Sequence, residues 1–230
     1  MVKHDHVSYM PELNNKSEVS GADVRAERPS RRQRKATETR LRIFRSALQL
    51  FGERGFGNVT VEEITEAADV GKGTFFNYFD SKEHVLGVMA EVQLARVEEA
   101  VLEAAAGKHS IRLTLHHLFL RLSEEPGRSP FLARTFIGSF LASAVVRELL
   151  RDRMAAARAM LETVIHQGQA RGEIDGSLAP VDVAFQMQQA VLGAVLLWSL
   201  HEEPEVKVWI EKSFRHFWRA VAAPRKGKKQ

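Results

Sequence analysis

The sequence predicts an all-α protein of about nine helices, in which a small N-terminal domain precedes a larger C-terminal one. After residue 36, apolar residues recur every three or four positions, as they do on the buried face of an α-helix. Proline stands near the start of several of these segments and glycine just past the end, where helices favour them. No later segment alternates polar and apolar residues in the manner of a half-buried strand.

The composition is that of a globular protein, with 44% apolar and 27% charged residues among 230. The absence of cysteine excludes a disulfide scaffold, a thiolate zinc site and a thiol nucleophile. The most apolar segment, residues 190–200, is too short to span a bilayer, and the N-terminus lacks the apolar core of a secretory signal. We therefore expect a cytoplasmic protein that is not associated with a membrane.

Positive charge is concentrated near the two ends of the chain. Residues 1–35 lack apolar periodicity and are expected to form a flexible basic arm, and residues 224–230 a basic tail. Between Arg25 and Arg45 there are nine lysines and arginines against two glutamates. Such runs are either solvated flanks or surfaces that attract a polyanion, and the second interpretation gains weight only beside an element that reads DNA.

The first expected helix spans residues 37–54, in which apolar side chains recur on one helical face before three glycines. Thr60 and Glu63 then have the spacing of a capping box, in which each side chain binds the other residue's backbone N–H at a helix start. The second expected helix therefore follows Thr60 and runs to about Ala68.

A break of three residues, Asp69-Val70-Gly71, separates the second helix from a third at residues 72–78. Aspartate adopts the left-handed backbone conformation at limited cost, so Asp69 suits such a turn. Two short helices across a tight turn form a helix-turn-helix, whose second helix enters the major groove of DNA. We therefore assign residues 36–82 to a helix-turn-helix DNA-binding domain.

The rest of the chain is expected to form six further helices. They are expected at residues 82–106, 110–124, 130–142, 144–171, 179–201 and 205–221. The helix at 179–201 is apolar on nearly all sides over its second half, and the last helix carries a continuous apolar stripe. Because one chain does not ordinarily cover its last two helices so fully, we expect two copies to pair through them.

Several features of residues 40–86 occur together in one known family. They are Ile43, Ala47, Leu50 and Phe51, then Thr60, Ile64 to Ala68, Val70 to Phe79, and Ser81-Lys82-Glu83. The segment thus resembles the TetR family of bacterial repressors. The resemblance implies a homodimer that binds a palindromic operator in double-stranded DNA, and a ligand-binding and dimerisation domain at residues 83–223 that senses a small effector.

Four residues depart from the usual pattern of that family. They are Thr65 in place of a small alanine, Asp69 in place of glycine, Gly71 in place of a serine or threonine cap, and Phe76 in place of a tyrosine. The first three leave the fold intact. The last removes a hydroxyl that often binds phosphate in the family, so neighbouring residues must supply that contact.

The expected DNA contacts fall into two groups. Lys72, Gly73 and Thr74 stand at the start of the third helix, where Lys72 can reach a guanine edge and Thr74 a base or a thymine methyl group. Asn77 can pair with adenine through two hydrogen bonds. The residues expected to hold phosphates are Thr60, Tyr78 and Lys82 together with the arginines of the arm, and Phe76 is counted with the DNA-facing residues.

The C-terminal domain contains aromatic residues interspersed with histidines. The residues singled out are His116, Phe119, Phe136, Phe140, His166 and Trp198. One interpretation is a packed core with hydrogen-bonded histidines. The other is an apolar pocket with a few polar anchors, which would take an apolar or aromatic effector of moderate size. The sequence leaves both interpretations open.

No catalytic motif is present. The chain has no glycine-rich phosphate loop, no G-x-S-x-G and no H-E-x-x-H, so we expect neither an enzyme nor a bound metal or cofactor. Two alternatives to a ligand-responsive repressor stay open at this point. One is a ligand-independent or architectural DNA-binding protein, and the other is a helical enzyme or scaffold that carries a segment like a DNA-binding motif.

Overall fold

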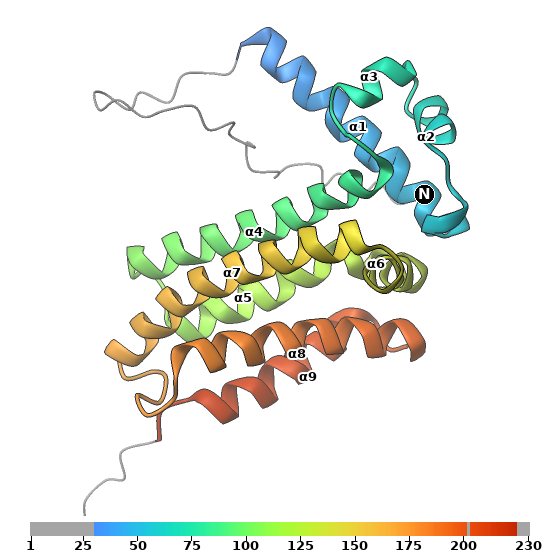
Figure 1. Ribbon diagram of the computed structural model, residues 1–230. Coiled ribbons are helices and arrows are strands. Elements are labelled where there is room, and N and C mark those ends of the chain that lie inside the picture. Colours follow the sequence, from blue (N-terminus) through green and yellow to red (C-terminus); the bar gives the residue numbers. More distant parts are fainter. Residues whose placement is uncertain (1–29, 202, 225–230) are drawn as a thin grey trace, which may run out of the picture.

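The computed structural model describes residues 30–201 and 203–224. Within these ranges the chain forms nine α-helices and two short 3₁₀ helices, which confirms the predicted all-α class (Figure 1). Most of the expected basic arm and tail, residues 1–29 and 225–230, lies outside the described residues.

The N-terminal domain contains three α-helices and one 3₁₀ turn. They are α1 (Arg31–Arg54), η1 (Phe56–Asn58), α2 (Val61–Ala67) and α3 (Lys72–Phe76). Helix α1 begins earlier than expected because Ser30 and Gln33 form a capping box, so residues 31–35 are helical and not part of an arm. Helix α3 ends two residues before the expected residue 78, because the backbone tightens there and the N–H of Tyr78 bonds the carbonyl of Phe75.

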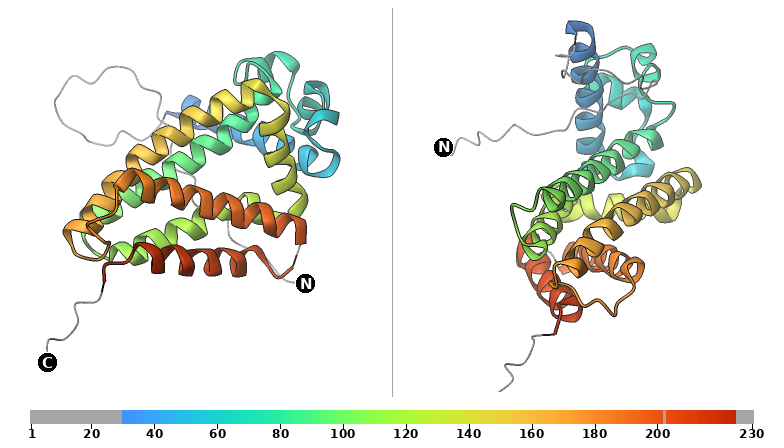
Figure 2. Two further views of the ribbon diagram at one scale, coloured as in Figure 1. Left: turned by 60° about the horizontal axis from the view of Figure 1, so that its bottom comes forward. Right: turned by 90° about the vertical axis from the view of Figure 1, so that its left-hand side faces the viewer.

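The C-terminal domain contains six α-helices close to the predicted ranges. They are α4 (Lys82–Ala106), α5 (Ile111–Glu124), α6 (Pro130–Ala142), α7 (Ala144–Ala170), α8 (Pro180–His201) and α9 (Val206–Val221), with the 3₁₀ turn η2 (Pro126–Arg128) before α6. Helix α4 lies between the N-terminal domain and the rest of the bundle (Figure 1). Helices α8 and α9 lie together on the side away from the N-terminal domain (Figure 2).

Two apolar cores divide the molecule, and the division does not follow the domain boundary. The first core joins α1, α2 and α3 to the first half of α4, and it also contains Leu132 of α6 and Val146 and Leu150 of α7. The second core fills the space among α4, α5, α7, α8 and α9. Helices α6 and α7 therefore connect the bundle directly to the interior of the N-terminal domain.

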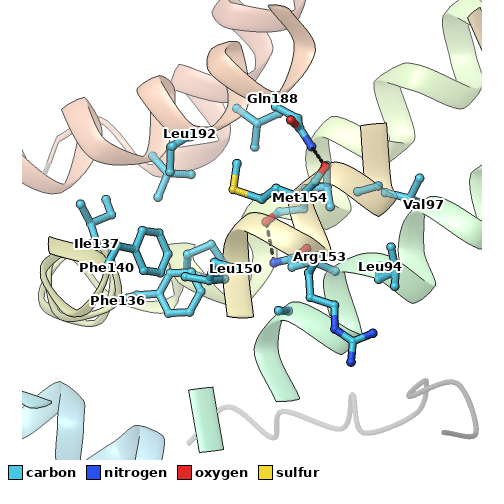
Figure 3. Close-up of a pocket in the computed structure, with 18 of the residues that line it drawn as sticks. Leu94, Val97, Phe136, Ile137, Phe140, Leu150, Arg153, Met154, Gln188 and Leu192 are labelled. Atoms are coloured by element: carbon cyan, nitrogen blue, oxygen red, sulfur yellow. Dashed lines mark hydrogen bonds between the residues drawn. The ribbon is translucent and has the colours of Figure 1, made fainter. Parts of the chain in front are cut away.

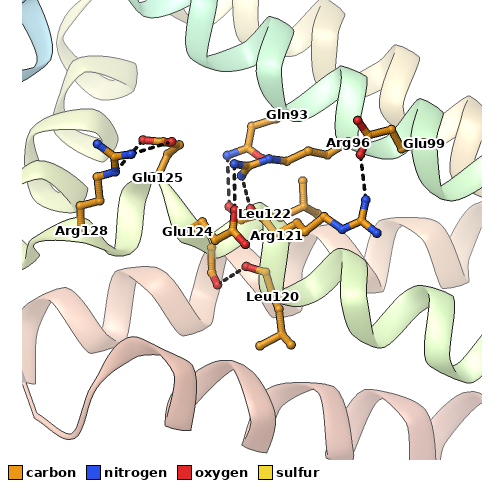
Figure 4. A network of polar contacts seen from close by, with 10 residues as sticks. Gln93, Arg96, Glu99, Leu120, Arg121, Leu122, Glu124, Glu125 and Arg128 are labelled. Atoms are coloured by element: carbon orange, nitrogen blue, oxygen red, sulfur yellow. Dashed lines mark hydrogen bonds and ion pairs between the residues drawn. The ribbon is translucent and has the colours of Figure 1, made fainter. Parts of the chain in front are cut away.

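A polar network fastens the second half of α4 to α5 (Figure 4). The guanidinium of Arg121 on α5 forms ion pairs with Glu99 and Glu103 of α4. In return, Arg96 of α4 donates to the carbonyl of Arg121, and Gln93 donates to the carbonyl of Leu122 at 3.1 Å. These bonds satisfy carbonyls at the end of α5 that have no partner within the helix. Burial lowers the pKa of Arg96, and the nearby glutamates oppose that effect.

Helix α8 is the one helix in the described part of the chain that is long and apolar enough to cross a membrane, although 44% of its most apolar window is buried within the protein. It packs against α6, α7 and α9. The side of α8 that faces these helices is buried in the bundle, which accounts for part of its apolar composition.

Candidate nucleic-acid interface and ligand cavity

The predicted capping box fixes the start of α2. The hydroxyl oxygen of Thr60 accepts the backbone N–H of Glu63 at 3.2 Å, and the carboxylate of Glu63 accepts the backbone N–H of Thr60 at 2.8 Å. The carboxylate of Glu63 also accepts the hydroxyl of Thr60 at 3.0 Å. The bonds from the backbone N–H and the hydroxyl of Thr60 favour the ionised carboxylate, and they lower the pKa of Glu63. The turn after α2 has Asp69 in the left-handed region at a φ of 49°, as its residue type predicted.

Two buried aromatic side chains hold α3 in place. Phe75 is 0% exposed and Phe79 is 3% exposed, and their ring centroids lie 5.5 Å apart in the first core. Helix α3 is too short to be stable on its own, so these anchors determine which of its faces points outward. The opposite face carries Lys72, Gly73, Phe76 and Asn77 as exposed residues, with Thr74 and Tyr78 half-buried beside them.

We call this exposed set, with Thr74 and Tyr78, the reading face. A Cβ atom added at Gly73 would meet no atom within 4 Å, so nothing in the chain itself prevents close approach to that backbone. Phe76 is 46% exposed and gives the reading face an apolar centre. Such a ring can contact a thymine methyl group or the sugar edges of a groove.

Lys72 is paired within the chain. Its ammonium forms an ion pair with Glu62 of α2, and both side chains are more than half exposed. The hydrogen bond from Lys72 is the largest of the effects that lower the pKa of Glu62. A DNA contact by Lys72 therefore requires it to exchange the carboxylate of Glu62 for a base or a phosphate, and exposed pairs of this kind are weak enough to exchange.

Lys82 was predicted to hold a phosphate, and in the structure it also has an internal role. Its ammonium donates to the carbonyls of Phe56 at 3.0 Å and Val59 at 2.8 Å, and it lies 4.8 Å from the centre of the Phe56 ring. These contacts fasten η1 and the entry to α2 against the start of α4. An ammonium has three donors, so one N–H is left for a phosphate.

A cavity of about 160 Å³ lies among α4, α5, α6, α7 and α8 (Figure 3). Phe136 and Phe140, two of the residues singled out from the sequence, line it. The remaining lining is mostly aliphatic. It includes Leu94 and Val97 of α4, Ile137 of α6, Leu150, Met154, Ala157 and Leu161 of α7, and Val191, Leu192 and Val195 of α8. The polar lining residues are Gln93, Arg153 and Gln188.

The other four residues expected at a pocket do not line this cavity. His116 binds Glu211 of α9 at 2.9 Å, and Phe119 is fully buried against Phe214 and Phe217 of α9. Trp198 is buried in the second core and His166 is exposed on α7. For Phe119 and His116, the interpretation of a packed core with a satisfied histidine is therefore the correct one. Helix α5 is turned so that these two side chains face α9.

The sequence contains one pattern that marks the side of α7 next to the cavity. Leu150, Met154, Ala157 and Leu161 recur along α7 at spacings of four, three and four, and all four line the cavity. That stripe identifies the inward face of α7. It does not separate residues that line a void from residues that fill a core, because both are apolar.

Comparison with known proteins gives matches along both domains. The family model described as "Bacterial regulatory proteins, tetR family" matches residues 43–89, and "Tetracyclin repressor-like, C-terminal domain" matches residues 131–214. The repressor DhaR of a Mycobacterium species is 32% identical over 174 residues, which cover 74% of this chain and 86% of DhaR. The regulator TcmR of Streptomyces glaucescens is 43% identical over 76 residues, a match that spans 33% of this chain and 32% of TcmR.

A solved structure repeats the whole architecture. The crystal structure of Thermus thermophilus FadR in complex with lauroyl-CoA superposes with a TM-score of 0.59 at 26% sequence identity, covering 83% of this chain and 99% of that one. The similarity extends through both the helix-turn-helix and the C-terminal bundle.

Proposed function

Because the chain belongs to the TetR family of bacterial DNA-binding transcriptional regulators, we propose that it acts as a homodimeric repressor that a small apolar or aromatic effector releases from a palindromic operator. The observation that carries this proposal is the reading face of α3, which is exposed and anchored from behind by Phe75 and Phe79. Within this face, Lys72, Thr74 and Asn77 read bases. Thr60, Tyr78 and Lys82 fix the register on phosphates.

The dimer that we propose pairs through α8 and α9. Helix α8 exposes Val181, Phe185, Leu192, Leu196 and Leu200 on one face at helical spacing, and Phe185 and Leu200 are 48% and 61% exposed. Exposed apolar side chains along one helix face, interrupted here by Gln189, are costly in water and are typical of a subunit interface. Twofold symmetry about that face would place two copies of α3 on one side of the DNA, at half-sites one turn or a small multiple of a turn apart.

Helix α6 offers a route from the cavity to the DNA-binding domain. One side of α6 lines the cavity with Phe136, Ile137 and Phe140. On another side, the hydroxyl of Thr135 donates to the carbonyl of Phe51 near the end of α1 at 3.1 Å. An effector that binds more tightly to one position of α6 would thereby favour one position of α1, and with it one spacing of the two reading faces.

We infer a cytoplasmic location, where the operator DNA is found. The related FadR of Thermus thermophilus is described in complex with lauroyl-CoA, which supports a small-molecule effector for this chain. The matched relatives are transcriptional regulators, which argues against the earlier alternative of an enzyme. The alternative of a ligand-independent regulator is tested by the second experiment below.

The proposal is tested by selecting genomic fragments with the purified full-length protein and sequencing those that stay bound. We expect one enriched inverted repeat, with half-sites separated by about one turn of DNA. Enrichment of no common sequence would contradict a specific operator. In a second experiment, candidate effectors are added to the operator complex, and failure of any bound ligand to release DNA would favour the ligand-independent alternative.

A further inference from the structure

The cavity adjoins an open groove between the end of α6 and the start of α7. The groove is lined by Phe140, Ala144, Arg147, Glu148, Leu150, Arg151 and Met154. Phe140, Leu150 and Met154 line the cavity as well, so these three side chains form the wall between the two spaces. Methionine is unbranched and adaptable, so a change of rotamer at Met154 can open a passage between the cavity and the groove without moving the backbone.

The cavity itself suits a hydrocarbon group. Of its polar lining residues, Gln188 is already engaged: it donates to the carbonyl of Met154 at 2.9 Å (Figure 3) and accepts from Arg158 at 3.0 Å. The amide nitrogen of Gln93 donates to the carbonyl of Leu122, and its buried side-chain oxygen has no hydrogen-bond partner among the described residues. A polar group placed against the aliphatic and aromatic side chains that form most of the lining would lose its water without gaining a partner, which disfavours it there.

The volume of the cavity limits the size of that hydrocarbon. At about 160 Å³ it is close to the engineered cavity of about 150 Å³ that accepts benzene. An apolar group of about six carbons, either a ring or a short chain, would fill it. A longer chain must continue past Met154 into the groove.

The groove differs from the cavity in its charge. Arg147 and Arg151 lie one helical turn apart on α7, so their side chains are neighbours on one face. Arg147 donates to the carbonyls of Phe140 and Leu141, which fixes its guanidinium at the end of α6. Arg151 has an exposed ion pair with Asp152 at 3.2 Å, and pairs of this kind exchange readily for another anion.

The positive charge of this region exceeds the negative. Arg153 lines the cavity and extends away from the phenyl rings (Figure 3), and it has no hydrogen bond or ion pair to another side chain in the described part of the chain. Three arginines, at 147, 151 and 153, thus stand beside two acids, Glu148 and Asp152. The guanidinium fork binds carboxylate and phosphate groups through paired hydrogen bonds.

From this arrangement we propose that the effector is an anionic amphiphile. Its apolar part, of about six carbons, occupies the cavity, and its carboxylate or phosphate group lies in the groove on Arg147 and Arg151. The inference rests on the proposed role of the cavity as the effector site. Two sources offer this chemistry, a free carboxylic acid and the thioester of an acid with a phosphorylated carrier.

The test compares three probes of equal chain length by calorimetric titration of the full-length protein: octanoate, 1-octanol and octanoyl-CoA. We expect octanoate to bind at least about tenfold more tightly than 1-octanol, since a hydrogen bond to a charged group contributes that much. In the double variant Arg147→Gln, Arg151→Gln this difference should disappear while the affinity for 1-octanol stays the same. Equal affinities for octanoate and 1-octanol in the unaltered protein would overturn the proposal.

Two further variants separate the head group from the chain. Arg112→Gln changes an exposed arginine beside Glu173, past the far end of α7, and should leave the preference for octanoate intact. Ala157→Phe fills the cavity and should weaken all three probes, with thermal unfolding measured to show that the variant is folded. If Ala157→Phe folds and binds both octanoate and 1-octanol as before, the cavity is not the site. Tighter binding of octanoyl-CoA than of octanoate would identify the thioester as the source.

Release of DNA is measured separately, so that the two proposals can fail independently. If octanoate binds in the expected manner but leaves the operator complex intact, the ligand class stands and the effector role fails. If an uncharged compound releases the DNA and octanoate does not bind, the repressor assignment stands and the anionic ligand is wrong.

Discussion

At the level of single residues, Asn77 is the clearest test of base reading. It follows α3 directly, its backbone N–H is bonded to Gly73, and its exposed side chain has no hydrogen-bond partner among the described residues. We expect Asn77→Ala to reduce discrimination at one base pair by about 1–3 kcal/mol while binding to other sequences changes little. The measurement is operator binding with each position varied in turn. Gln49→Ala, which removes an exposed amide from α1, serves as the control.

Substitutions at Lys82 and Lys72 should have different effects on stability and on DNA binding. Because Lys82 donates to two carbonyls of the η1 region, Lys82→Met is expected to lower the free energy of unfolding by about 1–3 kcal/mol. Lys72→Met removes only an exposed ion pair and should weaken DNA binding without a comparable loss of stability. Denaturant unfolding and DNA titration of both variants check this. Equal stability of the two variants would mean that the contacts of Lys82 contribute nothing to the fold.

At the level of elements, the start of α2 should be sensitive to acid. The backbone N–H of Thr60 is the largest cause of the lowered pKa of Glu63, and a carboxyl whose pKa is lowered by folding stabilises the folded state when ionised. That contribution is complete above the ordinary pKa of 4.5 and is lost as the pH falls through the lower native value. Glu63→Gln keeps an acceptor but does not titrate, so the loss of stability in that pH range should be smaller.

The comparison for Glu63 is Glu62→Gln. Glu62 also has a lowered pKa, but through Lys72 and not through the cap of α2. The free energy of unfolding, measured with denaturant between pH about 6 and about 3, should therefore fall less steeply with decreasing pH in each variant than in the unaltered protein. Only Glu63→Gln should also lose less helix at α2 as the pH falls. An identical pH dependence of unfolding in Glu63→Gln and the unaltered protein would exclude the capping carboxylate as a source of acid sensitivity.

The contact between α6 and α1 should carry the effector signal. Thr135→Val keeps the shape of the side chain and removes its hydrogen bond to Phe51. We expect effector binding to persist and the release of DNA to require a higher effector concentration, because the two helices are then less tightly coupled. Binding of the effector and dissociation of the operator are measured on the same samples. Unchanged release in this variant would show that coupling runs by another path, such as the ion pair between Arg40 of α1 and Glu91 of α4.

At the level of the whole molecule, the exposed face of α8 should decide the oligomeric state. A charge at Leu196 would be buried in the proposed interface, so Leu196→Glu is expected to give a folded monomer with weak operator binding. Light scattering during size-exclusion chromatography gives the molar mass, which distinguishes a monomer from a dimer. Leu102→Glu places the same charge at a leucine of α4 that is 69% exposed, and it should leave the dimer intact. A dimeric Leu196→Glu variant would place the interface elsewhere.

Much of the fold could be predicted from short sequence patterns. The order of the helices, the capping box at Thr60 and the turn at Asp69 were all predicted, because each depends on residues within a few positions of one another. The start of α1 was predicted too late because the basic residues after Ser30 were assigned to an arm. Their charge says nothing against a helix, since arginine, lysine and glutamine are good helix formers.

Contacts between segments that are distant in the sequence could not be predicted from these local patterns. Whether Phe119 faces a cavity or α9 depends on how far α5 is rotated about its axis, and many neighbours set that rotation together. The partners of Lys82 lie 23 and 26 residues away, in a loop whose path only packing fixes. The sequence by itself determined the helices, their order and the DNA-reading element. Only the tertiary structure decided which side chains enclose the cavity and which charges stand at its edge, because that depends on the mutual orientation of five helices.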